Sequence, residues 1–318
     1  MSRLRSFRRK WRPSSHPDCP DLVFVLFKDA KGWILEAICR EIAERYPGTC
    51  EFHDSASNLP MAKAYFFAHY GFFPPCLKYN PQLWNAKTLV YYTHAKELDI
   101  SNSELIYALN QCTRVVNMCS MSERQLFSEG VREKKLTHVV GAADPDFLKP
   151  HERGDGAIVI SSAYYGRKRP ELILELSSLL PNRNFLLIGR SWNEFDRFAE
   201  IEAAENIEYV ETAYENYPAL YERADVYVSS ARLEGGPIPL LETMMCNIVP
   251  VASRTGFAPD VIEHGRNGFL FDIDAPASAI AELVEAAYSL TGDISDAARK
   301  YSWDNFASRI HQLAQGAK

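Results

Sequence analysis

The sequence lacks any apolar run close to the ~20 residues that a membrane-spanning helix needs, so we expect no transmembrane segment. It also lacks a C-x-x-C pair, and its 7 cysteines are scattered singly. That pattern favours reduced thiols in a cytoplasmic compartment over disulfides or a zinc site. The net charge of −6 gives no general excess of cations. We therefore expect no nucleic-acid partner, although a local basic patch is compatible with this charge.

The composition is that of a globular protein, with 47% hydrophobic and 24% charged residues. A length of 318 residues suits two domains of ordinary size. Strands alternate with helices along the chain, which predicts two Rossmann-like domains with parallel sheets. We predict an N-terminal domain at 21–150 and a C-terminal domain at 151–302, preceded by a basic tail and linker at 1–20 and followed by an amphipathic helix at 303–318.

The tail at 1–13, MSRLRSFRRKWRP, interleaves arginines and a lysine with apolar residues. It has no hydrophobic core of a secretory signal. A segment of this kind can lie on an anionic membrane surface, and a disordered tail is the alternative. The first reading predicts a peripheral location on the cytoplasmic face of a membrane.

The stretch from 226 to 271 has the strongest local pattern. A β-branched run at Val226–Ser230 predicts a buried strand, and the loop Glu234–Pro237 with two glycines follows it. An apolar helix is expected over Ile238–Cys246, and a second strand over Ile248–Ala252. Strand, loop, helix and strand form a βαβ unit, and such units build parallel sheets.

Two carboxylates stand out in this unit, Glu234 in the loop and Glu242 in the helix. Glu242 lies among apolar neighbours, where a charged group needs a partner. A ligand hydroxyl is one candidate, because ligands bind at the carboxyl ends of parallel strands. Two such carboxylates suit a sugar and a ribose. The alternative is that Glu242 pairs locally and that Glu234 is a solvated loop residue.

The segments EGGPIPLLETM, VPVAS and HGRNGFLF follow one another here with regular spacing. Together they resemble the E-x7-E signature of retaining GT-B glycosyltransferases of family 4. The resemblance implies an α/β fold of two Rossmann-like domains that face a cleft. It also implies that the C-terminal helix packs back toward the N-terminal domain.

The basic turn 167–169 stands just before a predicted helix whose first residue can be Pro170. In that family a lysine at the start of this helix binds the diphosphate of the donor, and Lys168 is the best match. An arginine is usual about six residues earlier, but Ser161 and Ser162 stand there. Either Arg167 substitutes for that arginine, or the diphosphate is held with fewer charges. A solvated basic turn is the alternative for this segment.

The resemblance further implies that Glu234 is catalytic and holds hydroxyls of the donor sugar. The amides of Gly235 and Gly236 would assist it, and Glu242 would accept from the ribose hydroxyls. His94, just after the strand predicted at Thr88–Thr93, would be catalytic and face the sugar from the N-terminal domain. A structural, hydrogen-bonded histidine is its alternative.

The first strand-to-helix loop of the family usually carries a Gly-Gly pair near the donor or acceptor, and this chain has Gly32 alone. A single glycine there is more often structural. We find no D-x-D metal motif at the end of a predicted strand, and therefore expect no required divalent ion and no other cofactor.

The resulting prediction is a retaining glycosyltransferase that moves a sugar from a nucleotide-diphosphate sugar to an acceptor hydroxyl. A glycan or lipid-linked acceptor in polysaccharide or glycolipid assembly fits this prediction. Two alternatives are a non-catalytic GT-B relative that binds a sugar or a partner, and a GT-B nucleotide-sugar epimerase.

Overall fold

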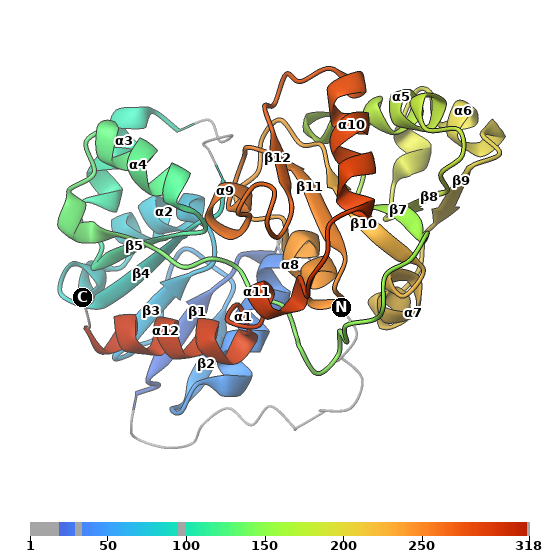
Figure 1. The fold of residues 1–318 in the computed structure, drawn as a ribbon. Helices are drawn as coiled ribbons and strands as arrows, with labels where there is room; N and C mark the ends of the chain where they lie inside the picture. Colours follow the sequence, from blue (N-terminus) through green and yellow to red (C-terminus); the bar gives the residue numbers. More distant parts are fainter. Residues whose placement is uncertain (1–18, 29–33, 95–99, 317–318) are drawn as a thin grey trace. The chain divides into compact units, whose positions relative to one another are not determined.

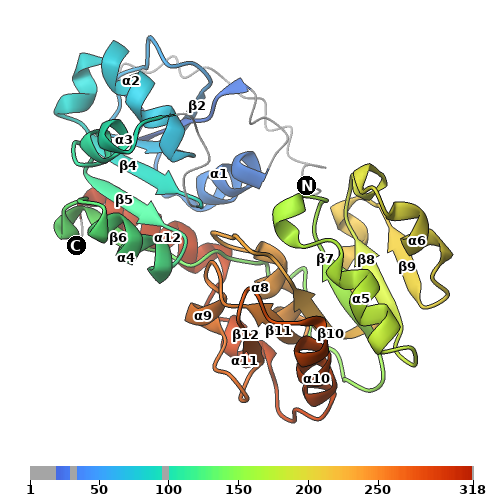
Figure 2. The ribbon, with the colours of Figure 1, turned by 90° about the horizontal axis from the view of Figure 1, so that it is seen from above.

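The structure is a computed structural model that describes residues 19–28, 34–94 and 100–316. The chain divides into two compact units, traced in Figures 1 and 2. The first unit takes the residues up to Val140 together with Trp303–Lys318, and the second takes Gly141–Ser302. The basic tail at 1–13 and Gly32, both singled out in the sequence, lie outside the described residues.

The first unit is built on a six-stranded parallel sheet with the order β2-β1-β3-β4-β5-β6. Two neighbouring inner strands, LVFV and AYFF, are buried on both faces, which is why they are apolar runs rather than alternating patterns, whereas the edge strand CEFH is half-buried. The strands are β1 (Leu22–Val25), β2 (Cys50–His53), β3 (Ala64–Phe67), β4 (Lys87–Tyr92), β5 (Arg114–Asn117) and β6 (Leu136–His138).

The second unit repeats this architecture with a six-stranded parallel sheet of order β12-β11-β10-β7-β8-β9. Its strands are β7 (Ala157–Ser161), β8 (Phe185–Ile188), β9 (Ile207–Val210), β10 (Ala224–Ser229), β11 (Val249–Ser253) and β12 (Phe269–Phe271).

Helices connect the strands of both sheets. Those of the first unit are α1 (Ile34–Arg45), α2 (Phe73–Tyr79), α3 (Asn102–Leu109), α4 (Ser120–Ser128) and α12 (Trp303–Gln315). Those of the second are α5 (Leu172–Leu179), α6 (Phe198–Ala203), α7 (Tyr217–Tyr221), α8 (Ile238–Met245), α9 (Ala258–Val261), α10 (Ala277–Tyr288) and α11 (Ser295–Ala298). In the part of the chain that the structure describes, no helix is both long and apolar enough to cross a membrane.

Helix α12 belongs to the first unit although it follows the second in the sequence. It lies beside α1 in both views (Figures 1 and 2) and buries the apolar face that the sequence pattern predicts, with Phe306 and Ile310 inside. Arg45 of α1 donates to Asp304 at 2.8 Å, and Lys87 Nζ donates to the carbonyl of Gln315 at 2.9 Å.

The division between the units falls earlier than the predicted boundary at residue 150. The segment after Val140 is bonded within the second unit, where the Ala143 amide donates to the carbonyl of Tyr301 at 3.0 Å. Gly141 is packed so closely there that an added Cβ would stand 2.7 Å from Ile238 Cδ1. These contacts attach the connecting segment to the second unit rather than to the first.

Strand β3 is a difference from the sequence analysis. The residues of the aromatic run Tyr65–Phe67, for which the sequence analysis predicts no strand, are fully buried. The structure adds that they form the strand that pairs with β1 and β4. A short strand buried on both faces shows no period of two, so periodicity does not reveal it.

Candidate functional site

The sheet topology of the second unit places a ligand site between β7 and β10. From β7 the chain proceeds to β8 and β9 on one side, and β10, β11 and β12 continue on the other side. The order therefore reverses between β7 and β10, and ligands of open parallel sheets bind at the carboxyl ends of strands at such a switch point. The loops that follow these two strands carry the residues singled out in the sequence.

Hydrogen bonds join these two loops directly. The hydroxyl of Ser230 donates to the carbonyl of Lys168 at 2.6 Å, and the amide of Arg232 donates to the carbonyl of Arg167 at 2.8 Å. The loop after β7 and the glycine loop after β10 are therefore held in register with one another.

Three of the predicted site residues come together in these loops. Lys168 Nζ donates to Glu234 Oε1, and Arg167 Nη1 lies 3.5 Å from Glu234 Oε2. The Glu234 side chain is only 8% exposed, so its charge depends on these two cations. Two cationic side chains and one carboxylate thus meet at this end of the sheet, and lysine and arginine are the side chains that bind phosphate groups through charge-assisted hydrogen bonds.

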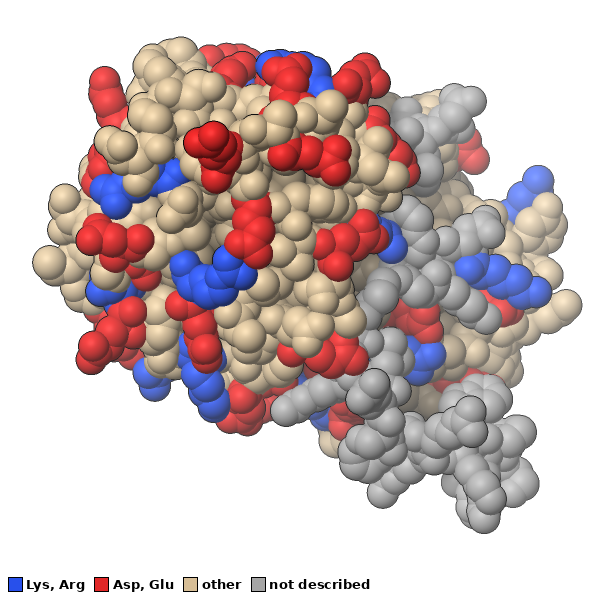
Figure 3. Space-filling model, turned by 90° about the vertical axis from the view of Figure 1, so that its right-hand side faces the viewer, with Lys and Arg blue, Asp and Glu red and all other residues tan. Residues whose placement is uncertain are grey.

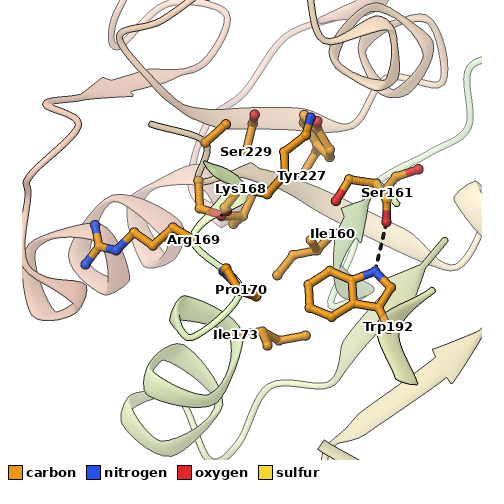
Figure 4. A pocket seen from close by; sticks show the side chains of 13 residues that line it. Ile160, Ser161, Lys168, Arg169, Pro170, Ile173, Trp192, Tyr227 and Ser229 are labelled. Atoms are coloured by element: carbon orange, nitrogen blue, oxygen red, sulfur yellow. Dashed lines mark hydrogen bonds between the residues drawn. The ribbon is translucent and has the colours of Figure 1, made fainter. Parts of the chain in front are cut away.

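A small cavity of about 20 Å³ lies beside Lys168, with room for about one water molecule. Figure 4 shows its lining: Ile160, Ile173 and Trp192 lie on one side, and the guanidinium of Arg169 points away from the other labelled side chains. Arg169 Nη1 donates to the carbonyl of Ala275 at 2.8 Å. Arg169 therefore anchors its loop within the second unit.

The helix after this basic turn begins later than the sequence predicts. Residues Gly166–Lys168 form a short 3-10 turn, and α5 starts at Leu172 rather than at Pro170. Arg169 has a φ of 56°, in the left-handed region, and a residue in that conformation interrupts a right-handed helix.

Glu242 lies on α8 and is 5% exposed. Its Oε1 accepts from the hydroxyl of Tyr214 at 2.5 Å, and its Oε2 accepts from that of Tyr221 at 3.1 Å. Burial raises the pKa of Glu242, while the two hydroxyls oppose that rise. The local partners that the sequence analysis kept as an alternative are therefore present. A carboxylate has about four acceptor sites, of which the two tyrosines use two, and the ribose role stays a prediction.

Neither tyrosine is part of the sequence signature. Tyr221 also lies 3.0 Å from the hydroxyl of Ser161, one of the two serines at the place where the family usually has an arginine. The signal that could have found these partners is the buried carboxylate itself, because it requires donors.

Gly256 packs directly against the glycine loop. Its replacement by alanine is expected to destabilise the protein by about 2–4 kcal/mol. Its φ is +57°, and an added Cβ would stand 2.8 Å from the carbonyl oxygen of Gly235 and 3.0 Å from Glu234 Cβ. The loop must move to relieve this contact. Urea unfolding of Gly256→Ala measures the cost.

Gly265→Ala is the matched control. Gly265 has a φ of +80°, but a Cβ there meets nothing within 4 Å, so only the backbone strain of about 1–2 kcal/mol is expected. Equal losses for the two variants would show that the contact with the glycine loop is unimportant.

In the first unit, His94 lies beside a second histidine that the sequence analysis does not single out. His69 follows β3 and His94 follows β4, so both lie at the carboxyl edge of the sheet, with ring centroids 5.6 Å apart. Burial, with His94 close by, lowers the pKa of His69 to about 4, so its ring is neutral at pH 7. The amide of Gly71 donates to His69 Nδ1 at 3.1 Å, which places the proton of the neutral ring on Nε2. His94 belongs to a different unit from Glu234, and its role toward a donor sugar stays a prediction.

A D-x-D motif does stand at a strand end, contrary to the expectation from the sequence. Asp272 and Asp274 follow β12 directly, with Ile273 between them. Their side chains are exposed, and Asp272 lies 3.4 Å from Arg254 Nε. Over the described ranges, no group of three histidine, cysteine or acidic residues is arranged to hold a metal.

Residues 145–302 match a family model described as glycosyl transferases group 1. The chain is 31% identical over 116 residues to a sucrose synthase of Acidithiobacillus caldus, a match that covers 32% of this chain and 14% of that protein. It is 26% identical over 205 residues to the GDP-mannose-dependent alpha-(1-6)-phosphatidylinositol monomannoside mannosyltransferase of Mycolicibacterium smegmatis, covering 56% of this chain and 53% of that protein. The chain thus spans about half or less of the length of these curated relatives.

The structure is similar to that of Anabaena HepE in complex with UDP, with a TM-score of 0.75 and 14% sequence identity. That match covers 93% of this chain and 99% of HepE. At this identity the likeness concerns the fold. The predicted fold class is confirmed: the chain has the α/β two-domain GT-B fold, and its residues 145–302 are similar to the glycosyl transferases group 1.

Proposed function

We propose that this protein transfers a sugar from a nucleotide-diphosphate sugar to an acceptor hydroxyl, with retention at the anomeric carbon. The cluster of Lys168, Arg167 and Glu234 at the switch point of the second sheet carries the proposal. The match of residues 145–302 to glycosyl transferases group 1 supports it. So does the GT-B fold shared with HepE, whose structures hold UDP and UDP-glucose.

The chemistry assigns a task to each charged group. The bond between the anomeric carbon and the diphosphate oxygen breaks, and its electron pair stays on the diphosphate. Lys168 and Arg167 would stabilise that charge, which is the main electrostatic need of the reaction. With a donor bound, Lys168 would donate to a phosphate oxygen. Glu234 would accept hydrogen bonds from hydroxyls of the sugar, and the amides of Gly235 and Gly236 would assist it.

Other parts of the proposal rest on the sequence. Glu242 would accept from the ribose, and His94 would contact the donor sugar. The proposal also includes membership of family 4 and independence of metal ions. It further includes a glycan or lipid-linked acceptor in polysaccharide or glycolipid assembly. A cytoplasmic, peripheral location would depend on residues 1–13, whose arginines could bind an anionic membrane.

Incubation of the purified protein with UDP-, GDP- and dTDP-sugars, with and without EDTA, tests the activity. We expect release of the nucleoside diphosphate from at least one donor, unchanged by EDTA, and accelerated by a suitable acceptor. NMR of the product gives the anomeric configuration, which should equal that of the donor.

Ser161 and Ser162, at the place of the usual arginine, favour one alternative. Tight binding of a nucleotide sugar without any release, for every donor and acceptor tried, would show a non-catalytic sugar-binding relative. Absence of nucleotide-sugar binding would contradict the proposal as a whole.

A further inference from the structure

The first unit contains a groove at the edge of its sheet that is opposite to the two histidines. It lies where β4, β5 and β6 begin, and Arg114 and Leu136 are the first residues of β5 and β6. His69 and His94, by contrast, follow the carboxyl ends of β3 and β4. The groove has a volume of about 720 Å³, within the range of small-molecule sites. Within this unit it is therefore separate from His94, which is assigned to sugar transfer.

Cationic side chains line this groove. Arg114, Lys134 and Lys135 contribute to its wall, Arg132 lies close by, and no aspartate or glutamate is among the lining residues. Within the described part of the chain, none of these four cations forms an ion pair with a carboxylate. Elsewhere such pairs are common: Arg183 and Arg197 each lie within 2.7 Å of a glutamate. Figure 3 likewise shows a face on which basic side chains lie next to acidic ones.

Backbone carbonyls hold these cations in place without neutralising them. Arg114 Nη1 donates to the carbonyls of Thr113 and Lys134 at 3.1 and 2.8 Å, and Lys135 Nζ donates to that of Cys112 at 2.6 Å. Burial lowers the pKa of Lys135, and the three neighbouring cations lower it further. A bound anion would relieve this repulsion and use the free donors of Arg114 and Lys135.

An aromatic side chain completes the groove. Trp84 lines it and is 50% exposed, so part of its indole surface is open to a ligand. Aromatic faces provide apolar surface for the C–H side of a sugar ring. Gln111, on the wall as well, offers an amide donor and acceptor for hydroxyl groups.

We propose that this groove binds an anionic sugar, with the ring against Trp84 and its phosphate or carboxylate on Arg114 and Lys134. The site lies beyond the proposed transfer reaction and is independent of the donor site. Its concave form favours a small saccharide over a flat membrane surface. A free sugar phosphate and an acidic residue of a longer glycan share this chemistry.

Calorimetric titration of the full chain with glucose 6-phosphate, glucuronate, glucose and inorganic phosphate tests the proposal. We expect one of the two anionic sugars to bind at least ten-fold more tightly than both glucose and phosphate. Lys134→Ala and Trp84→Ala should each weaken that binding at least five-fold. Lys134 is exposed, so its replacement leaves the fold intact.

The matched controls are Lys78→Ala and Tyr79→Ala, which remove an exposed cation and an exposed ring of the same unit outside the groove. Both variants should leave the binding of the anionic sugar unchanged. Lys168→Ala should leave it unchanged as well. This third control is informative because a sugar phosphate bound at the donor site, rather than in the groove, would be lost in that variant.

Several outcomes would overturn the proposal. Equal affinity for phosphate and for the anionic sugars, unaffected by Trp84→Ala, would show a plain anion site. Binding that survives both groove variants would place the ligand elsewhere. Binding to vesicles with anionic lipid that is lost in Lys134→Ala, without any binding of the sugars, would assign the groove to membranes.

Discussion

Lys168→Ala is expected to lower kcat/KM for the nucleotide sugar by about 10²–10³, because the leaving diphosphate loses its nearest cation. Most of the loss should appear in kcat, since the charge on the leaving group grows in the transition state. Nucleotide-diphosphate release under saturating and limiting donor measures both constants.

The same substitution should also cost stability. Glu234 is 8% exposed and would keep only Arg167, at 3.5 Å, as a cation close by. Removal of one partner of a buried pair leaves an undercompensated charge, and the remaining Arg167 limits the expected cost to about 1–3 kcal/mol. The double variant Lys168→Ala with Glu234→Gln should recover stability but not activity, which separates the two effects.

Arg197→Ala is the surface control for this prediction. Like Lys168→Ala, it removes one positive charge from the second structural unit, where Arg197 forms an exposed ion pair with Glu200. We expect no change in kcat/KM beyond about two-fold, as for most exposed pairs. A Lys168→Ala enzyme with unchanged kcat would remove the central support of the proposed function.

The cluster around Glu234 was accessible from the sequence because local patterns specify it. The run at Val226–Ser230, the glycine loop and the basic turn at Lys168 each mark the carboxyl end of a strand, and parallel strands bring these ends to one edge. Periodicity also predicts α12 and its buried face. The first residue of α5 was predicted too early, because no pattern announces that Arg169 adopts a left-handed conformation.

The partners of Glu242 were not accessible in this way. Tyr214 and Tyr221 reach it across more than twenty positions of the sequence. Neither tyrosine belongs to a motif. Only the folded chain decides which hydroxyl meets a buried carboxylate. His69 was missed for a related reason: it follows β3, whose aromatic run resembles core packing in general.

Glu242→Gln is expected to weaken binding of the nucleotide donor by about 10–100-fold. A neutral amide oxygen accepts hydroxyl hydrogen bonds less strongly than a carboxylate, and one of the two carboxylate oxygens is replaced by an NH2 group, which cannot accept. Fluorescence or calorimetric titration with the nucleoside diphosphate measures the change. If the affinity is unchanged, Glu242 serves its two tyrosines alone and the ribose assignment is wrong.

The difference in stability between this variant and the wild type should depend on pH. Burial raises the pKa of Glu242 above its ordinary value of 4.5, so the folded state binds the proton more tightly than the unfolded state does. The stability gained from this proton is complete below pH 4.5 and is lost as the pH rises through the raised pKa. The variant has no such group. Its free energy of unfolding relative to the wild type should therefore increase with pH over this window.

Urea unfolding of both proteins at a series of pH values tests this dependence, because all other carboxylates titrate alike in the two proteins and cancel in the difference. Glu263→Gln is the control, since Glu263 is an exposed partner of Arg266. The free energy of unfolding of this control, relative to the wild type, should not increase with pH above 4.5. A flat difference for Glu242→Gln would mean that the hydroxyls of Tyr214 and Tyr221 compensate the burial of the charge completely, so that the carboxylate can be ionised at no cost to the fold.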